Sequence, residues 1–130
     1  QLLNHSFTSC YFILTKNNSN IKVNVKSTKK PLVIVSFTTF PARIDKIWLV
    51  VECILRQETK PDKLLLWLSK EQFPSKEKLP KSLLDLEKRG LDIILCDEDL
   101  RSHKKYYYTL TNYPEDIMIT IDDDFFCFKA

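Results

Sequence analysis

The sequence predicts an α/β fold, in which a three-layer, mostly parallel sheet is built from repeated βαβ units. Four short apolar runs, beginning near residues 32, 64, 92 and 117, indicate the strands, and segments with helical spacing separate them. Most of these runs are continuous rather than alternating, which is typical of parallel strands buried on both faces. With 130 residues, 44% of them hydrophobic, the chain is long enough to bury a core of this kind.

Residues 1–30 precede this regular pattern and form a polar lead-in that is rich in Lys, Asn, Ser and Thr. Within it, Ile21, Val23 and Val25 alternate with polar residues, as in a short edge strand. The chain begins with Gln1 rather than Met, so we expect a processed, trimmed or partial chain. The predicted organisation is therefore a lead-in followed by one α/β domain over residues 31–130.

The first predicted unit runs from a strand at residues 32–35 through a helix at residues 44–57. Apolar residues in the helix recur at intervals of three and four, which places them on one stripe. These residues are Ile44, Ile47, Trp48, Val51, Ile54 and Leu55. A turn at residues 60–62 leads to a second strand at residues 64–68.

Residues 71–81 are charged and contain two prolines, so they predict a loop. Pro80 suits the first turn of a short helix at residues 81–89, and Gly90 suits a left-handed cap at its end. A third strand follows at residues 92–96.

A third long helix is predicted at residues 104–111, with Ser102 as its N-cap and Pro114 just beyond its end. The fourth strand, residues 117–121, runs directly into three aspartates, Asp122 to Asp124. Ligands of open parallel sheets bind beyond the carboxyl ends of the strands. The loops after the four strands should therefore form the candidate site.

The aspartate triplet is the sharpest chemical feature. Adjacent carboxylates repel one another strongly unless a cation or basic groups lie among them. If the strand conformation continues, Asp122 and Asp124 point to the same side and can bind Mg²⁺ or Mn²⁺ while phosphate oxygens complete the coordination. The alternative is a solvated turn, in which the aspartates accept hydrogen bonds from nearby backbone.

Two further segments carry groups that suit an anionic ligand. Arg101, Lys104 and Lys105 lie at the predicted mouth of a helix, where amides and the helix dipole favour anions. After the first strand, the loop from Thr38 to Arg43 offers hydroxyls, an aromatic ring and a guanidinium for a base, ribose or phosphate. A solvated surface cluster and a plain strand-to-helix connection remain the alternatives.

Composition narrows the classes of function. The formal net charge is only +3 and there is a single glycine, so neither nucleic-acid binding nor a glycine-rich phosphate loop is indicated. Cys53 and Cys96 lie in apolar runs and are expected to be buried, and the scattered cysteines fit a reduced, cytosolic setting. We expect the two tryptophans in the core and residues 106–108, all tyrosine, as a packing stripe.

Four stretches in order carry a family resemblance, namely VSFTTFPARI (35–44), KPDKLLLWLS (60–69), DLRSHKKYY (99–107) and TIDDD (120–124). Together they resemble bacterial glycosyltransferases of the family-2-like, GT-A type, which build surface polysaccharides such as capsule or lipopolysaccharide. The resemblance covers residues 31–124. It implies a nucleotide-binding half with a Rossmann-like sheet.

The resemblance also implies roles for individual residues. Mn²⁺ or Mg²⁺ would be held against the diphosphate by Asp122 and Asp124. The residues expected to contact the nucleotide-sugar are Thr38, Thr39, Pro41, Arg43, Asp97, Asp99, Arg101, Lys104, Lys105 and Asp123. The donor would be a nucleotide diphosphate sugar, with UDP-sugars favoured, and the acceptor a glycan or lipid-linked molecule. The resemblance places such an enzyme in the cytoplasm, at the inner face of the bacterial membrane.

Members of this family continue well beyond the DxD motif with an acceptor-binding half, whereas only residues 125–130 follow it here. We therefore expect a chain truncated after the DxD strand that lacks a catalytic base, does not transfer sugar alone, and self-associates through exposed apolar surface. Two alternatives remain open, a degenerate nucleotide-binding module without turnover and another metal-dependent, phosphate-handling α/β domain.

Overall fold

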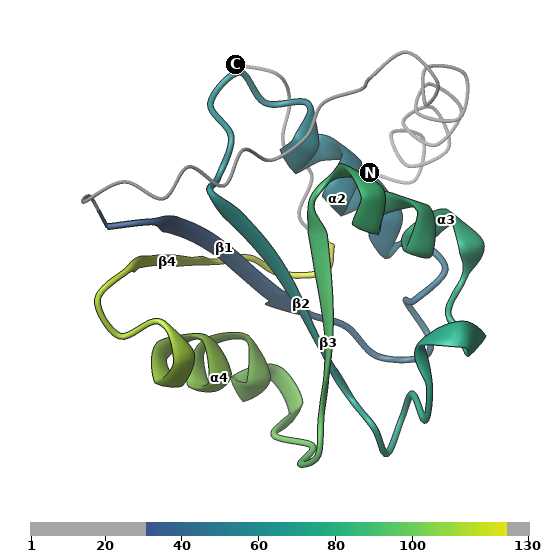
Figure 1. Cartoon of the computed structure of the whole chain (residues 1–130). Helices are drawn as coiled ribbons and strands as arrows, with labels where there is room; N and C mark the ends of the chain where they lie inside the picture. The colour runs from purple at the N-terminus through teal and green to yellow at the C-terminus, as the bar shows by residue number, and fades with distance from the viewer. Residues whose placement is uncertain (1–30, 125–130) are drawn as a thin grey trace.

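The computed structural model describes residues 31–124, and the predicted lead-in with its edge strand lies outside this range. Strands and helices alternate along the described chain, as predicted (Figure 1). The elements are β1 (Val33–Thr38), α2 (Ile47–Leu55), β2 (Lys63–Ser69), η2 (Lys76–Lys78), α3 (Lys81–Leu84), η3 (Asp85–Arg89), β3 (Leu91–Cys96), η4 (Arg101–His103), α4 (Lys104–Asn112) and β4 (Ile117–Thr120).

The four described strands form one sheet in the order β3-β2-β1-β4, and every pairing between neighbours is parallel. The chain thus builds outward from β1 to β3 and then crosses back to place β4 on the other side of β1. Helices α2 and α3 cover one face and α4 covers the opposite face (Figure 1). This confirms the predicted parallel α/β architecture, and it creates a reversal of strand order between β1 and β4.

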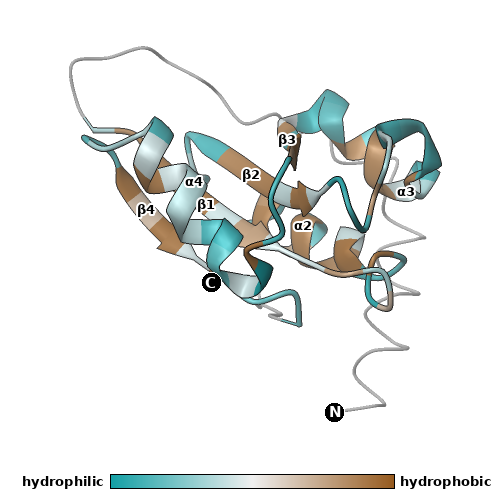
Figure 2. Cartoon of the chain, turned by 90° about the horizontal axis from the view of Figure 1, so that it is seen from below, coloured by the Kyte–Doolittle hydropathy of each residue, from teal (hydrophilic) through white to brown (hydrophobic). Residues whose placement is uncertain are grey.

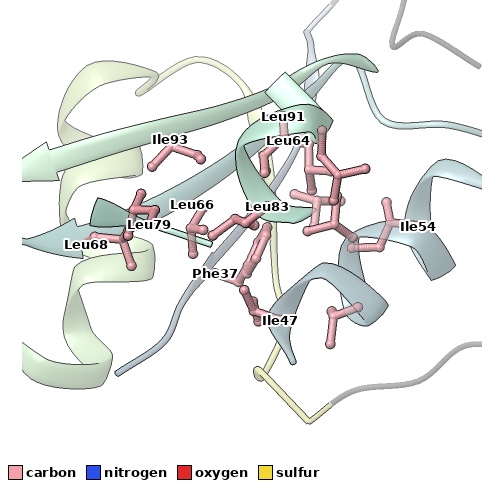
Figure 3. Close-up of a cluster of buried hydrophobic side chains, with 14 of the residues drawn as sticks. Phe37, Ile47, Ile54, Leu64, Leu66, Leu68, Leu79, Leu83, Leu91 and Ile93 are labelled. Atoms are coloured by element: carbon pink, nitrogen blue, oxygen red, sulfur yellow. The ribbon is translucent and has the colours of Figure 1, made fainter. Parts of the chain in front are cut away.

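The larger core lies between the sheet and the α2 and α3 layer (Figure 3). Because side chains alternate along a strand, Leu64, Leu66 and Leu68 of β2 face this layer, and all three are fully buried. From α2, Ile47 and Ile54 pack against the same cluster. Figure 2 shows that the strands and α2 are mainly hydrophobic, whereas the loops beyond them are mainly hydrophilic.

The opposite face carries a smaller apolar cluster under α4. It consists of Ile34, Leu65 and Trp67, and Tyr108 stacks on Trp67 with ring centroids 5.2 Å apart. The predicted tyrosine stripe is therefore only partly a packing surface, since Tyr107 is 54% exposed. Trp67, Cys53 and Cys96 are buried, as the sequence predicts.

A buried polar network joins α4 to the sheet. The Ser36 hydroxyl of β1 donates to the Lys105 carbonyl and lies 2.7 Å from the Thr109 hydroxyl. The Thr109 hydroxyl also accepts a 2.9 Å hydrogen bond from the Trp67 indole nitrogen. Ser36 and Thr109 are fully buried, so these groups have no access to water and depend on one another.

The start of α2 and the cap of α4 differ from the prediction, and the predicted helix at residues 81–89 is divided into α3 and η3. Helix α2 begins at Ile47 rather than residue 44, because residues 41–46 form turns closed by backbone bonds such as Arg43 N–H to Phe40 O, at 3.0 Å. Ser102 does not cap α4, which follows directly from η4 and has no side-chain cap at His103. The left-handed cap at Gly90 is confirmed, with φ of 111°.

Strand β4 is less covered than its neighbours. Ile117 and Ile119 are 52% and 46% exposed, although their partners Val33 and Val35 in β1 are shielded. Helices thus cover the sheet over β1 to β3 but leave β4 partly exposed to solvent. Across residues 31–124, no helix is both long and apolar enough to cross a bilayer.

We predict that Thr109→Val lowers the free energy of unfolding by about 1–3 kcal/mol, because the buried Trp67 N–H loses its acceptor while the side-chain volume is nearly kept. Thr111→Val in the same helix is the matched control, since Thr111 is exposed and should change stability by about 0.5 kcal/mol or less. Urea unfolding followed by tryptophan fluorescence measures both. Equal losses in the two variants would contradict the role given to the network.

Candidate functional site

The loops at the carboxyl ends of the strands enclose a pocket of about 530 Å³. Its walls come from the segments after all four strands, and it spans the reversal of strand order between β1 and β4. The lining residues are Thr38, Thr39, Phe40, Gln72, Asp99, Arg101, Ser102, Lys104, Lys105, Asp122 and Asp123. By charge they include three acidic and three basic side chains, so the pocket is mixed in sign rather than purely cationic or anionic.

The aspartates follow the end of β4, where Ile121 N–H still donates to Ser36 O at 3.2 Å and the chain then turns. The prediction that Asp122 and Asp124 point to the same side required the strand conformation to continue through Asp124. It does not continue, because residues 123 and 124 form a turn. Asp123 accepts hydrogen bonds from the Thr39 hydroxyl at 2.9 Å and from Arg43 Nη1 at 2.5 Å. Its side chain is only 11% exposed, which makes it the carboxylate that ties the β1 loop to the β4 loop.

The outer two aspartates are far more accessible. The side chains of Asp122 and Asp124 are 75% and 67% exposed, so both carboxylates can meet a ligand from solvent. Lys105 Nζ donates to Asp122 at 2.5 Å, and this contact, with the nearby charge of Arg43, lowers the pKa of Asp122 below its ordinary value. Asp124 lies 3.7 Å from Arg43 Nη1.

Lys104 is not available to a ligand in the way that the sequence predicts. Its side chain is 2% exposed and its ammonium donates to the Asp99 carboxylate. Asp99 also accepts the Arg101 backbone N–H at 3.0 Å, and the Lys104 hydrogen bond, followed by that backbone bond, lowers the pKa of Asp99. The pair therefore forms part of the pocket wall and stabilises the loop before α4.

Arg101 stands apart from the other cations of the pocket. Its φ of 51° puts a non-glycine residue in the left-handed region, which costs about 1–3 kcal/mol and which the bond to Asp99 helps to offset. Its side chain is exposed, and within residues 31–124 it has no hydrogen-bond or ion-pair partner. Of the described basic residues that line the pocket, Arg101 is the one left free to meet an anion.

The structure brings together most of the predicted site residues but not all of them. Four do not line the pocket, namely Pro41, Arg43, Asp97 and Asp124. Asp97 turns outward to pair with Lys70 at 2.5 Å, and Pro41 lies exposed in the turn before α2. Arg43 lies over the Phe40 ring, 5.3 Å from its centroid, and acts through its contacts with Asp123 and Asp124.

The pocket also contains two residues to which the sequence prediction gave no binding role. Gln72 comes from the segment predicted as a solvated loop, and Ser102 was predicted as a helix cap. Gln72 follows the carboxyl end of β2, and Ser102 follows that of β3. This position after a parallel strand was the sequence signal that could have identified both as site residues. The hydroxyls of Thr38 and Thr39 donate to Trp67 O and Asp123, so they order the β1 loop.

A metal ion at this site would rely on the aspartates. Within the described part of the chain, no group of three or more His, Cys, Asp and Glu side chains is arranged to hold a metal ion by itself. Carboxylate oxygens are nevertheless the donors that Mg²⁺ and Mn²⁺ prefer. Comparison with known proteins identified no matching family model, no similar curated protein and no similar solved structure.

We predict that Asp99→Asn lowers the free energy of unfolding by about 3 kcal/mol at neutral pH, because it leaves the buried Lys104 ammonium without its counter-charge. Asp97→Asn is the matched control. It breaks only the exposed pair with Lys70 and should cost about 0.5 kcal/mol or less.

The difference between wild type and Asp99→Asn should also depend on pH. The folded-state pKa of Asp99 is lowered, so its stabilising effect is fully present above the unfolded-state pKa of about 3.9 and is lost as pH falls toward the folded value. Urea unfolding between pH 7 and pH 3 measures this difference. A gap that stays constant, or that widens toward acid, would contradict the assigned ion pair.

Proposed function

We propose that the pocket binds a nucleoside diphosphate sugar together with a divalent cation, and that the chain supplies the donor site of a glycosyltransferase. The observation that carries the proposal is the mixed charge of the pocket at the reversal of strand order. Exposed carboxylates of the β4 loop suit a cation, and Arg101 and Lys105 suit the phosphates that the cation would bridge. A simple anion or a simple cation would use only half of these groups.

The arrangement of the sheet supports a nucleotide as the ligand. The order β3-β2-β1-β4 is the order of the first four strands of doubly wound, nucleotide-binding sheets, whose ligands lie at the reversal between the first and fourth strands. The ordered motifs of the sequence add the resemblance to GT-A enzymes of bacterial surface polysaccharide synthesis. On this proposal the acceptor is a glycan or a lipid-linked sugar, and a UDP-sugar is the favoured donor.

In this proposal each loop has its own task. The Phe40 ring, 43% exposed at the end of β1, offers a surface for the base. Arg101 binds the diphosphate, because its side chain is exposed and makes no hydrogen bond or ion pair within residues 31–124. Asp122 and Asp124 hold Mn²⁺ or Mg²⁺ through their exposed oxygens, and phosphate oxygens supply further ligands. When bound, the cation would neutralise charge that develops on the departing diphosphate.

The same geometry favours a second candidate, a module that binds the nucleotide without turnover. A general base works best with a pKa near the operating pH. Each carboxylate that lines the pocket has a basic partner, and the pKa values of Asp99 and Asp122 are lowered. Asp99 and Asp122 are therefore poorly suited to accept a proton from an acceptor hydroxyl.

We predict that UDP binds the purified chain in a Mn²⁺-dependent manner. Asp122→Asn and Asp124→Asn should each weaken the Mn²⁺-dependent binding at least tenfold, because each removes a carboxylate ligand. Arg101→Ala should weaken UDP binding with or without the metal. Isothermal titration calorimetry with UDP, GDP and TDP measures these affinities.

The control is Asp97→Asn, which changes an exposed aspartate outside the pocket and should leave the affinities unchanged. Circular dichroism checks that each variant is folded. The proposal fails if the folded wild-type chain binds none of the three nucleotides in the presence of Mn²⁺. Metal-independent binding of all three, unaffected by Asp122→Asn, would instead favour a phosphate-binding site without a metal.

A further inference from the structure

The acidic side of the pocket is paired with basic side chains from other loops. Lys105, in the first turn of α4, donates to Asp122 at 2.5 Å, and Arg43, in the β1 loop, contacts Asp123 and Asp124 at 2.5 and 3.7 Å. The Lys105 side chain is only 16% exposed, and its backbone carbonyl accepts the buried Ser36 hydroxyl. Its position beside Asp122 is therefore fixed by the attachment of α4 rather than by the ion pair alone.

A cation that binds Asp122 and an anion that binds Lys105 would each meet the ion pair that these two residues form. A divalent cation that binds the Asp122 carboxylate must share it with the Lys105 ammonium, which is bonded to Oδ1, and the two positive charges repel each other. An anion that binds Lys105 must likewise share the ammonium with Asp122. A cation alone is opposed by the charge of Lys105 and an anion alone by the charge of Asp122, whereas a cation and an anion together balance both charges.

We propose that the Lys105–Asp122 pair couples the binding of a divalent cation to the binding of a diphosphate, so that each ligand is bound weakly alone and more tightly with the other. This inference rests on the proposed function of the pocket. The coupling is reciprocal, because a change in the affinity for one ligand caused by the other must be equal in both directions. Arg43, which contacts Asp123 and Asp124, contributes to the same balance from the opposite loop.

The test compares wild type with Lys105→Met, which keeps the length of the buried stem and removes the charge. Free Mn²⁺ is measured by electron paramagnetic resonance during titration, with and without saturating UDP, and corrected for the Mn²⁺–UDP complex in solution. The variant should bind Mn²⁺ alone about 5-fold or more tightly than wild type, because Asp122 no longer has a competing ammonium. It should bind UDP more weakly, and the factor by which UDP strengthens Mn²⁺ binding should fall several-fold.

The control is Lys70→Met, since Lys70 forms an ion pair of the same length with Asp97 outside the pocket. Its Mn²⁺ and UDP constants should equal those of wild type. If wild type binds both ligands but Lys105→Met leaves the coupling factor unchanged, the inference is overturned and the proposed function stands. If neither ligand binds the folded wild-type chain, both are overturned.

Discussion

A buried polar contact joins α4 to the sheet, in which the hydroxyls of Ser36 and Thr109 meet the Trp67 indole beside the stacked ring of Tyr108. The Ser36 hydroxyl donates to the Lys105 carbonyl in the first turn of α4, and a buried hydroxyl left without a partner would cost free energy. Lys105 lies at the N-terminal end of α4, and this end of the helix lines the pocket. The Ser36 hydroxyl in the middle of β1 therefore helps to position Lys105, whose ammonium donates to Asp122.

Strands and their order of appearance could be predicted from the sequence because burial on both faces leaves a continuous apolar run, as in residues 64–68. The Gly90 cap was predictable for a similar reason, since a left-handed residue strongly favours glycine. The start of α2 was not. Ile44 continues the helical stripe in sequence, but Arg43 is held by Asp123, a residue 80 positions away, and the intervening turns delay the helix.

For the candidate site, too, one part could be predicted from the sequence and another could not. Parallel topology alone brings the strand ends to one edge, and for this reason loops at Thr38, Asp99, Lys105 and Asp122 could be predicted to meet. The sequence could not predict which charged side chains remain free for a ligand, because this depends on the ion pairs that they form in the folded protein. Lys104 and Lys105 are adjacent in sequence, yet the first is buried against Asp99 and the second reaches Asp122. Helical geometry points neighbouring residues about 100° apart, so a run of charges need not share a surface.

The ion pairs inside the pocket also limit which charged ligands it can bind. Since each lining carboxylate already has a basic partner, a lone cation at Asp122 is repelled by Lys105, and a lone anion at Lys105 is repelled by Asp122. A ligand that carries both signs meets neither cost in full, because both charges of the pair find partners on the ligand. The internal ion pairs would thus act as a filter that favours a cation–diphosphate complex over either component, and Arg101, which forms no such pair within residues 31–124, would supply the first contact with the anion.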